Sequence, residues 1–429
     1  MILRVGEVQL QEILRMGIGR AILYAQSHDL SGHRDVILDA CLHCYAYDIQ
    51  CEGTRASYMY DLVGCLPDKN FYYDRVLEAL KESGDDWDAA QRFHFAACLA
   101  FDGNDDAKRA MYAHYNPGPR NGELIGVDFL ELDGIEGFLF VAEKIGALLS
   151  EKPDEVDFGY LLSRSQDIFG DEPTWGALRE AGAKNFLIES YLRVSEEWSR
   201  RPTGAQSAEI TSLSYEKLLN KLPSIRPTLL WRWGQNASDK ELELAAEGLI
   251  AAKGSKQQLA HLRIFRLRPF PLDVNGLLPL VDVEQDRVGF AAIDALTNVV
   301  DPDIRALAFR LMDVRARCRG YAIKLLTANY EPGDQEIVLH WFQDEEDRET
   351  LHSMGMGLID FCQRHPDERA EILLMRSLYD KGPCSFCRAS AVRRLMELGA
   401  LSDELRAECA WDANSDIRDM VNPTVAPPQ

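Results

Sequence analysis

Apolar residues recur at intervals of three and four along most of this chain, a spacing that predicts α-helices. In the segment 286–296, Val288, Ala292 and Leu296 fall on one helical face. In the second half, an acidic residue or a serine opens each such segment, where its side chain accepts bonds from the first-turn N–H groups. These openers are Asp286, Asp303, Asp334, Asp347, Asp367, Ser385, Asp403 and Asp416. We therefore predict an all-α fold in which short loops join antiparallel helices.

Two short motifs carry a family resemblance. Residues 301–305 read Asp-Pro-Asp-Ile-Arg, residues 416–418 read Asp-Ile-Arg, and small side chains stand at Ala291, Ala292, Ala306 and Ala308. In these residues the segment 280–429 resembles the HEAT-repeat family of α-solenoids, including its bacterial HEAT-like class. The resemblance implies an α-solenoid of stacked antiparallel helix pairs, a HEAT-like superhelix. No specific activity carries over from it.

In this family an Asp and an Arg often bridge successive repeats. Arg305 and Arg418 match the Arg position of that bridge. The resemblance pairs Arg305 with Asp301 or Asp303, and Arg418 with Asp412 or Asp416.

A polar stretch that contains Pro and Gly, residues 199–207, predicts the boundary between two parts of the chain. We expect an N-terminal helical-repeat array at residues 1–200 and a C-terminal HEAT-like array at residues 208–421. The last residues, 422–429, contain three prolines and predict a disordered tail.

Charge and hydropathy limit the partners and the cellular location that we expect for this protein. With 47 Lys and Arg against 69 Asp and Glu, the formal charge is −22, which opposes non-specific binding to nucleic acid or to anionic lipid. No apolar run approaches the roughly 18–20 residues that span a bilayer, and no signal peptide is recognisable. We expect a cytoplasmic protein with reduced cysteines and no membrane partner.

Two Cys-x-x-Cys pairs, Cys41/Cys44 and Cys384/Cys387, each offer half of a zinc site. The ends of a solenoid lie far apart, unless a dimer or a closed ring brings the two pairs together. Helical spacing provides another explanation, because Ile37, Cys41 and Cys44 form one buried stripe and cysteine often behaves as a small hydrophobic residue. We predict structural cysteines, with no metal and no cofactor.

The stretch 261–270 is the most unusual in the chain, because it holds His261, Arg263, Arg266 and Arg268 between aromatic residues. Residues 261–330 contain ten Lys or Arg and eight Asp or Glu, so this region is mildly basic in an acidic molecule. We name these four residues, together with Trp231 and Trp233, as the candidate binding residues. They suit a phosphate, a carboxylate-rich peptide or a nucleic-acid backbone, whereas the alternative is pairing with acids of adjacent helices.

The motifs of the main soluble enzyme classes are absent from the sequence, so no catalytic residue is predicted. Stacked helix pairs generate a long curved surface, which suits recognition of a protein or an extended peptide. The leading hypothesis is therefore a non-enzymatic protein-binding scaffold or adaptor that uses the concave face of a HEAT-like solenoid. The alternatives are a nucleic-acid-binding HEAT-like protein of the DNA-glycosylase type, disfavoured by the charge, and a HEAT-like lyase. The partner, the pathway and the oligomeric state are left open.

Overall fold

A computed structural model describes residues 7–82, 87–152, 156–200, 210–282, 286–314 and 318–422. Within these ranges the chain forms helices and no strand, which confirms the all-α prediction. None of these helices is long and apolar enough to cross a membrane. Residues 201–207 of the predicted boundary and residues 423–429 of the predicted tail lie outside the described ranges.

The chain forms two compact units, and the first is built from both ends of the sequence. It comprises Met1–Arg201, Cys384–Ala389 and Leu401–Gln429. Its helices are α1 (Glu7–Met16), α2 (Arg20–Ala25), η1 (Ser31–His33), α3 (Arg34–Leu42), α4 (Ile49–Glu52), α5 (Ala56–Gly64), α6 (Lys69–Ala79), α7 (Trp87–Phe101), α8 (Asp105–His114), α9 (Gly122–Asp133), α10 (Ile135–Glu151), α11 (Tyr160–Phe169), α12 (Asp171–Gly182), α13 (Phe186–Ser199), α27 (Asp403–Cys409) and α28 (Ser415–Val421).

The second unit comprises Pro202–Pro383 and Ser390–Ala400. Its helices are α15 (Tyr215–Leu219), η2 (Leu222–Ser224), α16 (Pro227–Asn236), α17 (Asp239–Ala251), α18 (Ser255–Ile264), η3 (Val274–Gly276), α19 (Leu278–Val281), α20 (Asp286–Leu296), α21 (Pro302–Val314), α22 (Arg319–Ala328), α23 (Asp334–Asp344), α24 (Arg348–Arg364), α25 (Glu368–Lys381) and most of α26 (Ser385–Glu397). These units differ from the predicted arrays in one respect, because 384–389 and 401–422 group with the N-terminal residues.

Several predicted helix starts agree with the structure. The predicted segment 286–296 is α20, and the side chains of Asp347 and Asp367 cap α24 and α25 by accepting N–H bonds from Thr350 and Ala370. Helix α26 is followed by Gly399, whose φ of 64° is a conformation that favours glycine. The local capping rule and the apolar period therefore predicted these elements correctly.

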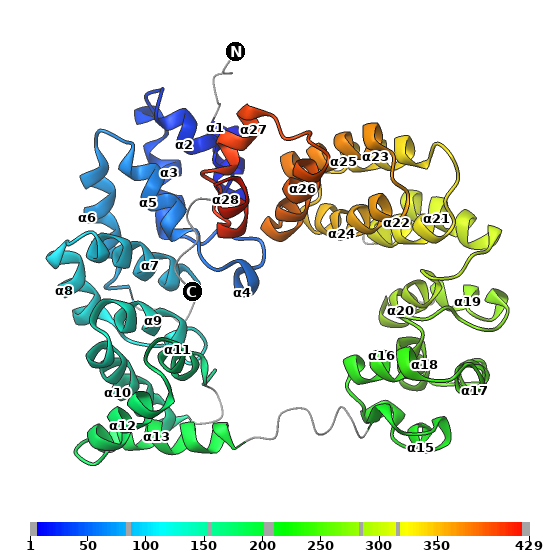
Figure 1. Ribbon diagram of the computed structural model, residues 1–429, viewed down its shortest axis with the longest axis horizontal. Helices are drawn as coiled ribbons and strands as arrows, with labels where there is room; N and C mark the ends of the chain where they lie inside the picture. The colour runs from blue at the N-terminus through cyan, green and yellow to red at the C-terminus, as the bar shows by residue number, and fades with distance from the viewer. Residues whose placement is uncertain are drawn as a thin grey trace. The chain divides into compact units, whose positions relative to one another are not determined.

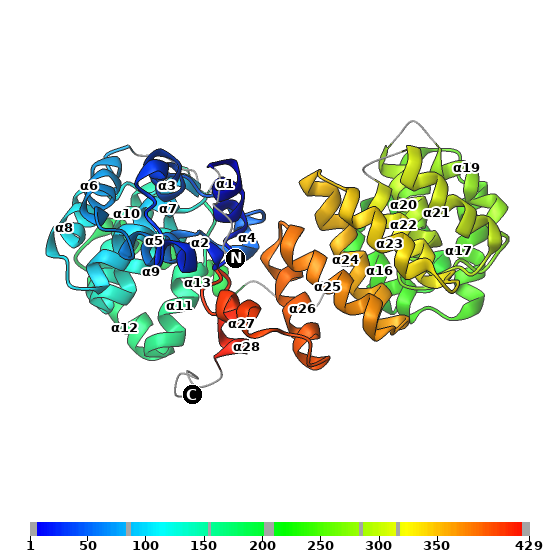
Figure 2. The same ribbon diagram turned by 90° about the horizontal axis from the view of Figure 1, so that it is seen from above.

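In the second unit, one series of helices packs member against member. Helix α16 contacts α18, α18 contacts α20, α20 contacts α22, and α22 contacts α24. The intervening helices cover this row, α17 on α18, α19 on α20 and α21 on α22 (Figures 1 and 2). Each helix buries its apolar stripe against sequence neighbours; in α21, for example, Ile304, Ala308 and Leu311 are all buried.

Arg305 ties three successive helices of this unit together. Its guanidinium donates two hydrogen bonds to Asp334 at the start of α23, at 2.7 and 2.8 Å, and a third to the carbonyl of Asn329 at 2.8 Å. Asp334 is 1% exposed, so this ion pair is shielded from water. The acids that Arg305 binds are therefore Asp334, the opener of the next segment, and the more exposed Glu331 at 3.1 Å, and not Asp301 or Asp303. Arg418 in the first unit instead donates to the carbonyls of Asp412 and Ala413.

In the first unit, α27 and the loop that follows it pack against the turn between the N-terminal helices α1 and α2 (Figure 1). The N–H of Ala413 donates to the carbonyl of Gly17 at 2.8 Å, and Arg20 forms two hydrogen bonds with Glu408 at 2.9 and 3.0 Å. A Cβ added at Gly19 would lie 2.0 Å from the carbonyl oxygen of Glu408. The two backbones therefore approach closely at a position that only glycine fits.

A fully buried ion pair also belongs to this region of the first unit. Arg388 and Asp412 lie 3.3 Å apart, and both side chains are completely shielded from solvent. Burial raises the pKa of Asp412, although the Arg388 guanidinium opposes the shift. A buried pair of this kind is destabilising to break, since the remaining charge would be left in a medium of low polarity.

Candidate peptide-binding groove

Two of the six predicted binding residues are parts of the core. Trp233 is 1% exposed, and its Nε1 donates to the carbonyl of Leu213 at 2.8 Å. His261 is 2% exposed; its Nδ1 lies 2.8 Å from the carbonyl of Gln257 and its Nε2 lies 2.9 Å from the Tyr215 hydroxyl. Because a carbonyl only accepts, Nδ1 carries the proton and Nε2 accepts from tyrosine. Burial lowers the pKa of His261, so this ring is neutral and structural.

Trp231 and Arg266 are brought together. The guanidinium carbon of Arg266 lies 3.9 Å from the Trp231 ring centroid, and its Nε lies 3.1 Å from the carboxylate of Asp294 on α20. Arg268 instead pairs with Asp239 of α17 at 2.8 Å. Burial, with a smaller contribution from nearby Arg287, lowers the pKa of Arg263.

Arg266 opens onto a cavity of about 310 Å³ that crosses the row of helices in the second unit. Residues from the turn after α18, from the end of α20 and the turn that follows it, and from α22 and α24 form its wall. These residues are Arg266, Leu267, Asp294, Thr297, Asn298, Lys324, Asp360 and Arg364, and we call the space that they line the groove. Its volume is at the lower end of the range, about 300–1,000 Å³, that is usual for ligand sites.

Aromatic rings position the cations of the groove. The Nζ of Lys324 lies 5.4 Å from the ring centroid of Tyr321 on the same helix. Tyr321 in turn stacks on Phe290 of α20, with centroids 6.0 Å apart and planes inclined by 27°. Arg266 over Trp231 repeats the arrangement at the other end. Cations that lie over aromatic faces are restrained without losing their charge.

The charges of the groove do not cancel. Arg266 pairs with Asp294, and Arg364 pairs with Asp360 at 3.0 Å. Among the described residues, no carboxylate lies within ion-pair distance of Lys324. Burial raises the pKa of Asp294, while the charges of Arg266 and Lys324 act in the opposite direction. Three cations and two acids thus leave one positive charge, centred on Lys324.

Exposed apolar side chains flank these charges. Leu267 in the wall is 48% exposed, and Val300, two residues beyond the wall residue Asn298, is 78% exposed. The Asn298 side chain donates to the carbonyl of Arg266 at 3.2 Å and joins the two loops that carry them. A cationic centre beside apolar side chains is suited to a peptide that presents an acidic residue next to an apolar one.

Asp294, Lys324 and Arg364 were not predicted from the sequence as binding residues. Each is an isolated charge in an ordinary amphipathic helix, so no local pattern distinguishes it. Their separations, 30 residues and then 40, are close to the length of one helix pair.

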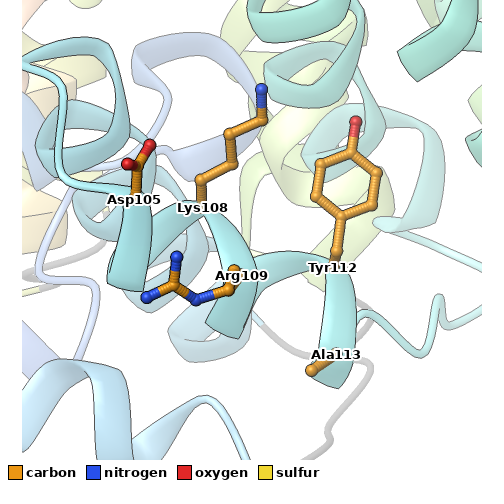
Figure 3. A pocket seen from close by; sticks show the side chains of 5 residues that line it. All are labelled: Asp105, Lys108, Arg109, Tyr112 and Ala113. Carbon is orange, nitrogen blue, oxygen red and sulfur yellow. The ribbon is translucent and has the colours of Figure 1, made fainter.

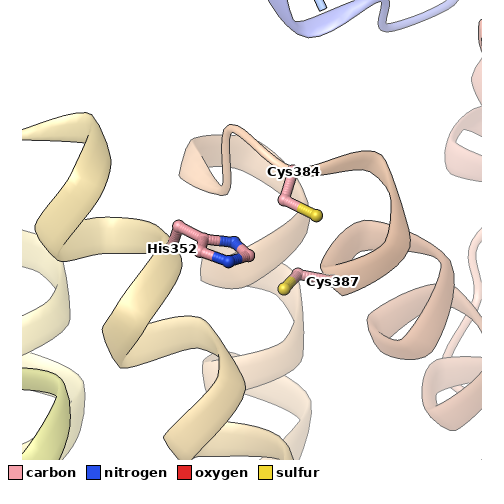
Figure 4. Close-up of side chains that lie close together, drawn as sticks. All are labelled: His352, Cys384 and Cys387. Atoms are coloured by element: carbon pink, nitrogen blue, oxygen red, sulfur yellow. The ribbon is translucent and has the colours of Figure 1, made fainter. Parts of the chain in front are cut away.

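No cysteine is among the residues that line the groove. Cys41 is buried, and this burial raises the pKa of its thiol. Cys384 and Cys387 belong to the first unit, and their sulfurs lie within 4.8 Å of each other (Figure 4). A hydrogen bond between the two thiols, together with burial, raises the pKa of Cys387. His352, also drawn in Figure 4, belongs to the second unit.

A further hollow lies on the surface of α8, where its lining side chains come from a single helix (Figure 3). Lys108 there pairs with Asp133 at 2.5 Å, and Arg109 pairs with Asp106. Tyr112 donates to the same Asp133 at 2.6 Å. These polar groups are already engaged with their neighbours, so the hollow carries no site.

Comparison with protein-family models, with curated proteins and with solved structures finds no match for this chain. A functional proposal therefore depends on the chemistry of the groove and on the packing of the helices around it.

Proposed function

We propose that this protein is a cytoplasmic, HEAT-like α-solenoid adaptor whose second unit binds an extended peptide of a partner protein. The observation that carries the proposal is the groove, with one uncompensated cation, Lys324, beside the exposed Leu267. The acidic residue of the peptide lies at Lys324, and the apolar residue beside it covers Leu267.

The packing of the second unit supports this proposal. Helices α20, α22 and α24 of one row, together with the turn after α18, supply the groove, and a row of stacked helix pairs presents its residues along a line. An extended peptide follows such a line, whereas a compact ligand would need walls on more sides.

The charge of the whole chain bears on the partner. Because the formal charge is −22, the partner is neutral or basic over most of its contact, with its acidic residue at the groove. Long-range attraction then sets the association rate, while the pairing with Lys324 sets the position of the peptide. None of the ten cysteines forms a disulfide, which agrees with a reducing compartment.

Panning a displayed library of random peptides against the purified protein tests the proposal. We expect selected peptides to share an acidic residue next to an apolar one. Lys324→Glu should weaken the binding of a selected peptide about tenfold, which corresponds to a loss of about 1.4 kcal/mol in binding free energy. Lys240→Glu, at an exposed lysine of α17, is the matched control and should leave the affinity unchanged.

Arg266→Glu is a poorer test, although Arg266 has more contacts. It would place a second acid next to the half-buried Asp294 and would remove the stacking on Trp231, so melting and binding would change together. Lys324 has no ion pair to lose among the described residues. Binding that survives Lys324→Glu, or duplex DNA binding that depends on Lys324, would overturn the proposal.

A further inference from the structure

A second cavity, of about 730 Å³, lies wholly within the first unit. Its wall comes from α4, from the first residue of α7, from the start of α9 and from the segment that leads into α11. We propose that this cavity binds a guanidinium or ammonium group, such as a basic side chain of a partner. The site is separate from the groove and does not depend on the proposed function.

Three aromatic rings line the cavity. Trp87 and Phe158 are half-buried, and Tyr160 is 54% exposed, so each retains surface that is open to a ligand. Phe158 packs on the buried Tyr191 with ring centroids 5.0 Å apart, which restrains its orientation. The faces of aromatic rings carry negative potential and attract cations.

The formal charges of the wall are negative. Glu52, Glu123 and Asp157 contribute three carboxylates against one guanidinium, that of Arg120, which is itself engaged in an interaction. The side chain of Glu52 is shielded from solvent and pairs with Arg55 at 2.7 Å. Its charge is therefore largely compensated.

Glu123 acts as a structural part of the wall. Its Oε2 accepts bonds from the N–H groups of Gly159, Tyr160 and Leu161 at 2.8, 2.7 and 3.2 Å, and its Oε1 accepts from Tyr191 at 3.2 Å. The carboxyl thereby holds the start of α11 in place. The carboxylate of Asp157 is exposed and has no ion pair among the described residues, so it is the charge that remains for a ligand.

An anionic ligand fits the wall less well, although α7, α9 and α11 all begin at the wall. The first turn of α7 contains Asp88, which already accepts the N–H of Cys44 at 2.7 Å. Glu123 lies in the first turn of α9 and occupies the N–H groups of α11. Acidic residues thus lie in the first turns of α7 and α9, Glu123 caps the start of α11, and the negative charge that they place at these helix ends favours a cation.

The experiment uses selective ¹⁵N labelling of tryptophan in the full chain, which has seven tryptophans. The Nε1–H signal of Trp87, assigned with Trp87→Phe, reports on the cavity directly. The probe is N-acetyl-arginine amide. Its matched control is N-acetyl-citrulline amide, which has nearly the same shape and no charge.

We expect the arginine probe to shift the Trp87 signal and to bind about tenfold more tightly than the citrulline probe. Asp157→Asn should weaken the arginine probe about fivefold, in line with loss of one solvent-exposed ion pair. Asp167→Asn, at an exposed acid of α11, should leave its affinity unchanged.

Equal binding of citrulline would show that charge is not recognised and would overturn the proposal. A Trp87 signal that stays in place up to the solubility limit of the arginine probe would overturn it too, as would preferential binding of N-acetyl-glutamate amide. An unchanged thermal transition of Asp157→Asn shows that the fold is intact, so weaker binding by that variant is a property of the site.

Discussion

Gly19 provides the sharpest test of how the two ends of the sequence form one unit. A methyl group at this position would lie 2.0 Å from the Glu408 carbonyl oxygen and 2.7 Å from the Trp411 Cβ. Both atoms belong to the C-terminal segment, and the first is backbone, so no side-chain rotation relieves the overlap. Gly19→Ala must therefore push the segment that carries α27 away from α2.

The cost follows from the contacts that this displacement breaks. Overpacking against well-ordered neighbours costs about 1–3 kcal/mol. Losing the Ala413 to Gly17 hydrogen bond adds about 1 kcal/mol, and weakening the partly buried Arg20–Glu408 pair adds about 1 kcal/mol. Alanine also lowers the conformational entropy of the unfolded chain, which offsets about 0.4–1 kcal/mol of this loss in stability. We expect a net loss of about 3 kcal/mol from the first unit.

Urea unfolding followed by tryptophan fluorescence measures this loss, and amide hydrogen exchange over residues 401–422 locates it. Gly32→Ala is the matched control, because a methyl group there meets no atom within 4 Å. If Gly19→Ala retained both the unfolding midpoint and the exchange protection of the native protein, the C-terminal segment would not pack on α2 as described.

Three further predictions concern other parts of the chain. Arg305→Ala should destabilise the second unit by about 3 kcal/mol, because it leaves Asp334 buried without its cation. The control Arg310→Ala removes an exposed ion pair with Asp282 and should cost under about 1 kcal/mol. Equal urea midpoints for the two variants would contradict this prediction. Burial raises the pKa of Glu123 from 4.5 to about 7, so folding takes up a proton between these pH values. The free energy of unfolding therefore falls by about 3 kcal/mol as the pH rises from 4.5 to 7. Glu123→Gln should remove this part of the pH dependence, and parallel stability–pH curves for the variant and the native protein would refute the prediction. In native protein treated with iodoacetamide, mass spectrometry should find the exposed Cys51 alkylated before Cys41, Cys384 and Cys387, which are buried and become accessible on unfolding; early modification of Cys41 would contradict its burial.

The parts of the fold that the sequence predicted are those that local chemistry determines. An Asp cap and an apolar period act within a few residues, so the starts of α20, α24 and α25 were readable. The partner of Arg305 was not, because Asp334 lies 29 positions away and any opener of a neighbouring segment satisfies the same charge. Similarly, the apolar residues of α27 and α28 do not specify which helices they pack against.

The candidate site was predicted in part for the same reason. Arg266 and Trp231 were recognisable as an unusual cation and an unusual aromatic residue, and the structure brings them together. Trp233 and His261 stood out in the sequence for the same reason, yet their positions on the helices turn both side chains into the core. The hydrogen bond that fixes His261 joins it to Tyr215, 46 residues away in the sequence. The cavity of the first unit draws on segments from 49 to 160, and none of them is distinctive alone.

The discontinuous first unit also has a consequence for biosynthesis. Residues 1–200 leave the ribosome long before residues 401–422, which complete their packing. At translation rates of about 5–20 residues per second, the delay is on the order of 10–40 s. During that interval the face around Gly17 and Gly19 is uncovered on the nascent chain, so ribosome-associated chaperones have a defined surface to protect until the last helices are made.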